Sequence, residues 1–309
     1  MQSIRPHRGY RLNGRRDAQA QSGRSEQGLH VMPLITQRHG KRRVRIARVA
    51  RDGIHNEIRE LVVEAMLEGN FAASYTMGDN SGVVATDTIK NIANIVGREH
   101  LDACPERYAQ ALAQRLLDRY EQVTRTHIVC HEIKWSRATI GGLPHPHAFT
   151  LDANGRPLAE VIATREGMRT ISGIAGYTFM KTTQSGWVGF VRDEATTLPE
   201  TTDRIAATSI DARWNWRAEP ADYPAANATV LSTMLEIFAT TYSRGIQDSL
   251  YRMGEAALAA VPELEAIAMA CPNKHYVGVD LTPFGLSSDN LLFTPTDEPH
   301  GQIECTVGR

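Results

Sequence analysis

The sequence lacks any long apolar run, because no segment offers the about 20 consecutive apolar residues that a membrane-spanning helix needs. It also lacks an excess of charge, since 34 lysines and arginines oppose 35 aspartates and glutamates, for a net charge of -1. Proteins that mainly bind nucleic acid or anionic membranes need an excess of basic residues. We therefore expect a protein with neither nucleic acid nor membrane as a partner.

Cysteine is scarce, and the four cysteines show no pattern. Cys104, Cys130, Cys271 and Cys305 are isolated from one another, and no CxxC pair occurs. This usage is typical of a compartment in which thiols stay reduced, so the expected location is the cytoplasm.

The usual cofactor motifs are also missing. The chain contains no GxGxxG, GxxxxGK[ST], GxSxG or HExxH string, so the common dinucleotide, nucleotide, esterase and zinc-peptidase signatures are absent. One group invites a metal interpretation, namely His127, Cys130, His131, His145 and His147. Its spacing fits no zinc pattern, and we favour packing or loop hydrogen bonding over a metal site.

Residues 1–31 are poor in apolar side chains and contain six arginines. Such a segment cannot form a core, so we predict a disordered basic tail. A nucleic-acid arm or an organellar transit sequence is the functional alternative. A dispensable extension, or a start codon placed before the true start at Met32, is the favoured interpretation.

Hydrophobic periodicity then predicts strands, helices and strands, in that order. The stretch 57–68 could be a helix, but its apolar residues alternate with glutamates, which favours a strand. Thr86 and Asp87 are expected to cap the next helix. The first half is expected to contain strands at about 44–49 and 57–68, helices from about 86 and from Pro105, and strands at about 126–138 and 147–163.

The second half repeats this order. It is expected to contain strands at about 169–183 and 208–217, helices at about 225–242 and 246–260, and strands near 275–281 and 302–307. The expected fold is therefore α+β, with two tandem ββααββ modules at 32–165 and 166–309. Antiparallel sheets of this kind have edges that must be covered, and association with other copies would do that.

Several polar strings are more specific than these elements. They are Gly40–Arg45, Tyr75–Asn91, Lys181–Glu194, Thr196–Arg204 and Pro272–Tyr276. In this order, and over about residues 41–309, they resemble the urate oxidase family, the cofactor-independent uricases.

The resemblance implies the tunnelling fold, in which tandem ββααββ modules close into β-barrels by association as a homotetramer around a central tunnel. It implies oxidation of urate with O₂ to 5-hydroxyisourate and H₂O₂, without a cofactor or metal. It also implies sites that lie between subunits.

Residues carried over by these motifs divide into a clamp and a proton path. In the clamp, Arg204 grips urate, Gln247 faces it, Trp187 stacks on it and Ile246 adds a backbone contact. The proton path has catalytic roles for Lys41, Thr86 and His275, with Thr86, Asp87 and Asn273 at the substrate.

Physical chemistry supports these residue types. A guanidinium and a carboxamide match the donors and acceptors on a purine edge. Oxidation without a metal requires removal of a proton from the substrate, and a partly buried lysine amine can serve as the base.

Trp187 departs from the family, in which phenylalanine is common at this position.

Two alternative functions stay open: a purine-binding protein of this fold with impaired catalysis, and a relative that uses zinc to process pterins.

Overall fold

The computed structural model describes residues 32–309 except 52 and 102, so the expected tail lies outside the described residues. The chain divides into two units, 1–35 and 36–309, and only the second is described below. Within the described residues, none of the helices combines the length and the apolar character needed to cross a membrane.

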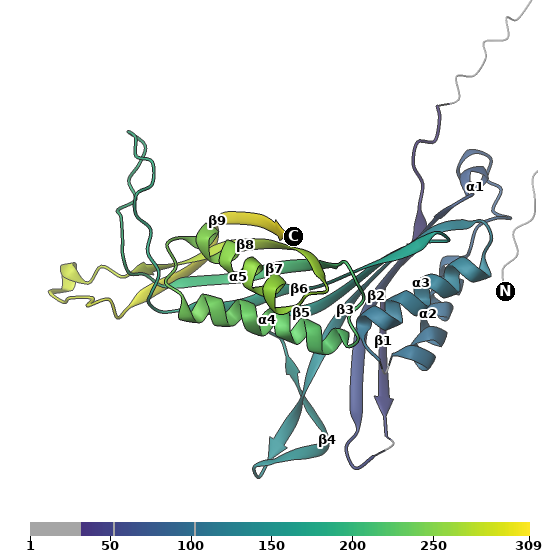
Figure 1. Ribbon diagram of the computed structural model, residues 1–309, viewed down its shortest axis with the longest axis horizontal. Helices are drawn as coiled ribbons and strands as arrows, with labels where there is room; N and C mark the ends of the chain where they lie inside the picture. The colour runs from purple at the N-terminus through teal and green to yellow at the C-terminus, as the bar shows by residue number, and fades with distance from the viewer. Residues whose placement is uncertain (1–31, 52, 102) are drawn as a thin grey trace, which may run out of the picture. The chain divides into compact units, whose positions relative to one another are not determined.

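The second unit is built on one antiparallel sheet with the order β1-β2-β3-β5-β6-β7-β8-β9, and β4 pairs with β3 alone (Figure 1). The strands are β1 (His39–Ala50), β2 (Glu57–Gly69), β3 (Val123–Ile140), β4 (Leu143–Asp152), β5 (Arg156–Thr164), β6 (Gly167–Lys181), β7 (Ala206–Trp216), β8 (Leu264–Gly278) and β9 (Phe293–Gly308). Among the described residues, no strand pairs with the outer edge of β1 or β9. The sheet is therefore open, and another chain would be needed to close it.

Two pairs of helices pack against the sheet, one pair in each half (Figure 1). They are α2 (Thr86–His100) with α3 (Pro105–Arg119), and α4 (Tyr223–Thr240) with α5 (Ile246–Ala260); a short α1 (Ala72–Thr76) and a 3₁₀ turn η1 (Thr282–Phe284) lie between other elements. The order ββααββ thus occurs twice, with β4 as an addition to the first half. The expected α+β class and tandem order are confirmed.

Each helix pair has its own hydrophobic cluster. Leu61, Ile89 and Leu112 are fully buried in the first cluster, and Ile210 and Leu250 are buried in the second. The proposed division at 165/166 remains a prediction.

Several sequence expectations are confirmed. Residues 57–69 form a strand, because the apolar side chains that alternate along it, such as Leu61 and Val63, are buried against the helices. The face of Tyr108, Leu112 and Leu116 on α3 is fully buried.

Three local expectations were wrong. The stretch 147–163 is two strands, because an Asx turn, in which Asn154 N–H donates to Asp152 at 3.2 Å, and Gly155 at a φ of 75° break it. The last strand pair begins earlier than expected: β8 starts at Leu264, where alanines on the exposed face weaken the alternation. Thr86 and Asp87 do not cap α2, because its N-cap residue is Ala85, which makes no side-chain capping bond.

A charged cluster lies on the sheet near the junction of the two halves. The Glu160 carboxylate on β5 accepts a hydrogen bond from His127 Nε2 at 2.7 Å, if that nitrogen is protonated, and pairs with Arg213 Nη1 at 2.6 Å. Gly173 of β6 lies beside Arg213: a Cβ there would be 2.4 Å from Ala212 O and 3.3 Å from Arg213 Cγ. The close approach of β7 therefore requires glycine at 173.

This cluster predicts a pH-dependent contribution to stability. The hydrogen bond with His127 and, against the opposing effect of burial, the charge of Arg213 hold the pKa of Glu160 below its ordinary value of 4.5. A lowered folded-state pKa contributes stability that is fully present above the unfolded-state value and is lost as pH falls through the folded-state value. In urea unfolding, Glu160→Gln should therefore be less stable than wild type at pH 7, and the difference should shrink below about pH 4.5.

Glu255→Gln, at an exposed position of α5, serves as the control and should show a much smaller difference at pH 7. A Glu160→Gln difference that stays constant from pH 7 to pH 3.5 would contradict the assignment.

Candidate active site

The first group of site residues lies where β1 passes the start of α2. His39 Nε2 lies 3.0 Å from Val84 O, which ties β1 to the segment preceding the helix. Two residues later, Lys41 pairs with Ala65 of β2, and a bulge follows in which Arg43 has a φ of 58°. A bulge re-aims the side chains beside it, and here it directly follows Lys41.

Lys41 and Asp87 are brought together, and Thr86 lies beside Asp87 at the first position of α2. The pKa of Asp87 is lowered, first by its hydrogen bond from Lys90 and also by the positive charge of Lys41. Asn91 Nδ2 donates to the other carboxylate oxygen at 3.2 Å. The structure therefore places Lys41, which is half-buried, near the exposed Thr86 and Asp87.

The second group is built on the loop between β6 and β7. Trp187 and Thr201 exchange backbone hydrogen bonds at 2.7 and 3.1 Å, which closes the loop on itself. The Arg204 N–H donates to Ser185 O at 2.8 Å, and Gly186 N–H donates to Ser243 O at 2.9 Å. The second of these bonds joins the loop to the turn that precedes α5.

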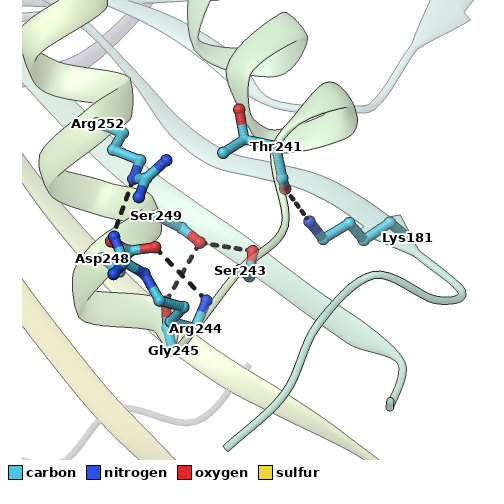
Figure 2. Close-up of polar contacts among 8 residues, drawn as sticks. All are labelled: Lys181, Thr241, Ser243, Arg244, Gly245, Asp248, Ser249 and Arg252. Carbon is cyan, nitrogen blue, oxygen red and sulfur yellow. Dashed lines mark hydrogen bonds and ion pairs between the residues drawn. The ribbon is translucent and has the colours of Figure 1, made fainter. Parts of the chain in front are cut away.

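That turn, residues 241–245, is held by side chains (Figure 2). Ser243 and Ser249 share a hydrogen bond of 2.6 Å between their hydroxyls. Lys181 Nζ donates to Thr241 O at 2.8 Å, and Asp248 pairs with arginines on both sides of it, Arg244 at 3.2 Å and Arg252 at 3.1 Å. The start of α5 is therefore fixed, with Ile246 buried and Gln247 exposed.

Arg204 presents an unused donor. Its Nε is buried and has no hydrogen-bond partner within the described part of the chain, and burial lowers the pKa of the guanidinium. A buried polar group without a partner costs about 1–3 kcal/mol. A ligand that accepts a hydrogen bond from Arg204 would remove this cost.

Asn273 and His275 lie on β8, at the end of the sheet where Arg204 leads into β7. Asn273 pairs with Thr208 of β7, and residues two apart on a strand share a face. Asn273 therefore continues the face of Cys271, which lines a small gap together with Ile246, whereas the pairing of β8 with β9 shifts register between Asn273 and His275. The structure thus places Asn273 on the side of the sheet that carries α5, and His275 follows it on the same strand beyond the shift.

The two groups do not meet within one chain. Among the described residues, no hydrogen bond or ion pair joins Lys41, Thr86 or Asp87 to the second group. Six strand steps separate β1 from β8, which at about 4.8 Å per step is about 29 Å along the sheet. The two groups of candidate residues therefore lie apart in the chain, and we call them the first half-site (Lys41, Thr86 and Asp87) and the second half-site (the group on the loop, α5 and β8).

Two of the residues considered for metal binding, His127 and His145, make hydrogen bonds instead. His127 contacts Glu160, and His145 Nδ1 accepts a hydrogen bond from the Ala148 N–H at 3.0 Å. His131 Nδ1 is buried and has no hydrogen-bond partner among the residues that the structure describes, and burial lowers the pKa of this histidine. Within the described ranges, no group of three or more histidine, cysteine, aspartate or glutamate residues could hold a metal ion.

Sequence reasoning missed the residues that support the second group. Lys181 bonds carbonyl groups about 60 residues away, and the turn before α5 depends on Ser243 and Ser249. Serine and lysine are common residue types, so nothing in their local sequence marks these roles.

Ligand binding by Arg204 is predicted to depend on the planar guanidinium, which holds two N–H donors side by side. If Arg204 grips urate, as the resemblance implies, Arg204→Lys should weaken urate binding by about 2 to 4 kcal/mol, because a point charge cannot replace two fixed donors. Calorimetry under nitrogen would measure the affinity. Arg115→Lys, at a position on α3 that pairs with Glu99, is the matched control, and equal affinities for the two variants would remove Arg204 from the clamp.

The fold defines a class: tandem ββααββ proteins in which two pairs of helices pack on one open antiparallel sheet. Within that class, the family is specific. The family model described as Uricase matches residues 37–162 and 170–304, and the chain belongs to the uricase family.

Curated relatives support the same family. The chain is 37% identical over 271 residues to the uricase of Arthrobacter globiformis, with 88% of each chain covered. It is 36% identical over 291 residues to the uricase of Aspergillus flavus, with 88% of this chain and 95% of the relative covered.

Solved structures agree as well. The crystal structure of uricase from Arthrobacter globiformis matches with a TM-score of 0.85 and 37% identity, over 90% of this chain and 95% of that one. A uricase from Bacillus fastidious matches with a TM-score of 0.78 at 23% identity, over 88% of this chain and 94% of that one, which shows the fold alone.

Proposed function

We propose that this protein is a urate oxidase in purine degradation, which converts urate, O₂ and water to 5-hydroxyisourate and H₂O₂ without a cofactor. Membership of the uricase family and the relatives named uricase support this proposal. The structural observation that carries it is the buried Nε of Arg204, which has no hydrogen-bond partner in the described part of the chain and lies on the loop that holds Trp187. A planar acceptor stacked on the indole would satisfy that donor.

In this proposal, each half-site has its own task. Arg204 and Gln247 grip the edge of urate, Trp187 covers one of its faces, and Ile246 contributes a backbone contact. Lys41 and Thr86 remove and carry the proton, Asp87 contacts the substrate, and His275 continues the relay. Asn273 holds the oxygen species over the ring, so that the reacting atoms stay close.

The proposed assembly is a homotetramer with sites between subunits. It is supported by the open edges of β1 and β9 and by the separation of the two half-sites in one chain. Urate and O₂ are the proposed small-molecule partners. The proposed cytoplasmic location is supported by four cysteines that are free in the structure.

The test measures urate loss, oxygen uptake and peroxide release together on protein treated with a chelator. We expect all three in equal amounts. Urate binding without peroxide would instead identify an impaired binding protein, and activity that returns only when metal is added would identify metal-dependent chemistry.

A further inference from the structure

Gly245, the residue before α5, lies against the edge of the Trp187 indole. A Cβ built on Gly245 would lie 2.7 Å from Cζ3 and 3.0 Å from Cε3 of Trp187, and 3.3 Å from Oε1 of Gln247. Carbon atoms in good contact are about 3.5–4.0 Å apart. The six-membered ring of the indole therefore occupies the space that a side chain at position 245 would need.

The backbone at Gly245 is held in place. Its carbonyl accepts hydrogen bonds from the N–H and the hydroxyl of Ser249, both at 3.2 Å, and Ser249 also bonds Ser243 (Figure 2). Ser243 is in turn paired with Gln184 and Gly186 at 2.9 Å each. The φ and ψ of Gly245, both 168°, are extended values that any residue adopts. Glycine is therefore required at this position by the lack of space for a side chain, not by the backbone conformation.

The indole is constrained on other sides as well. Its backbone is paired with Thr201, and its ring stacks on Phe190 with 5.8 Å between centroids and 9° between planes. A methyl group added at 245 must therefore push the ring away from α5, because both the turn and the base of the ring are fixed.

We propose that Gly245 is a positioning residue that seats the Trp187 ring, so that the glycine and the tryptophan act as a complementary pair in the substrate site. This inference rests on the proposed function, in which Trp187 stacks on urate. A phenylalanine at position 187 would carry only a six-membered ring, which is smaller than the indole. A tryptophan at position 187 therefore requires the absence of a side chain at 245, and the pair sets the height and tilt of the stacking surface.

A double-mutant cycle tests this pairing with Gly245→Ala, Trp187→Phe and the double variant. Because displacement of a positioned group by about 1 Å can cost about 100-fold, we expect Gly245→Ala to lower kcat/KM about 10- to 100-fold, mainly through KM. The double variant should return to within about 3-fold of Trp187→Phe alone, since the smaller ring makes room for the methyl group. Gly167→Ala is the control, because a Cβ at Gly167 would meet nothing within 4 Å.

Thermal unfolding of the same four proteins measures the contact without reference to turnover. A Gly245→Ala chain that loses stability, or fails to fold, and is restored by Trp187→Phe supports the pairing. Losses that simply add, in both kcat/KM and thermal midpoint, would overturn it. If wild type lacks urate turnover, the proposed function fails, but the coupling in thermal midpoints still decides whether Gly245 seats the ring.

Discussion

Replacing Lys41 by methionine is expected to slow the chemical step by about 10² to 10⁴-fold while urate still binds, the range for loss of a general base. Methionine keeps an apolar stem of similar length, so the strand position stays filled. The amine alone is lost, and with it the group proposed to take a proton from urate. Because clamp residues lie on other elements, the affinity for urate should change little.

Stopped-flow single turnover separates the chemical step from binding, and anaerobic titration gives the urate affinity. Lys134→Met is the matched control, because Lys134 is a strand lysine whose ammonium pairs with Asp152 at 2.9 Å, away from both half-sites. The control should keep wild-type turnover. A Lys41→Met variant that changes only the Michaelis constant would contradict the role of Lys41 as a base.

The fold could be predicted to a large extent because its signals are local. The alternation of Leu61 and Val63 with glutamates, and the buried face of α3, each report burial on one side of an element. Where a signal depended on a single turn, as at Asn154 and Gly155, the expectation failed. The start of β8 was also predicted wrongly, because its alanines weaken the alternation and alanine indicates neither a strand face nor a turn.

The site was predictable only in part. Residue motifs supplied the proposed members of both half-sites, which stay predictions. They did not indicate the supporting residues, because hydrogen bonds such as Lys181 to Thr241 join segments distant in sequence. The tight contact of Gly245 with Trp187 is likewise invisible in the sequence, since it depends on the path of two loops in space. Contacts between segments distant in sequence are therefore found only in the folded structure.

Mixed oligomers of two inactive variants are expected to regain activity if the half-sites of different subunits combine. Thr86→Ala removes a hydroxyl from the first half-site, and Arg204→Ala removes the guanidinium of the second. Each homogeneous variant should be nearly inactive, because every one of its sites carries the defect. Each variant nevertheless retains the half-site that the other lacks.

In a mixed oligomer, some interfaces pair the intact Thr86 of one chain with the intact Arg204 of the other, and the reciprocal interfaces carry both defects. Activity should therefore reappear in proportion to the intact interfaces, well above the sum of the two homogeneous variants. Two defects within one chain's own site cannot produce such a gain, because combining damaged sites creates no intact one. Co-expression with two affinity tags, followed by native mass spectrometry, would confirm mixing. Confirmed mixed oligomers whose activity stays at the sum of the parents would place the whole site within a single chain, despite the about 29 Å of sheet that separates β1 from β8.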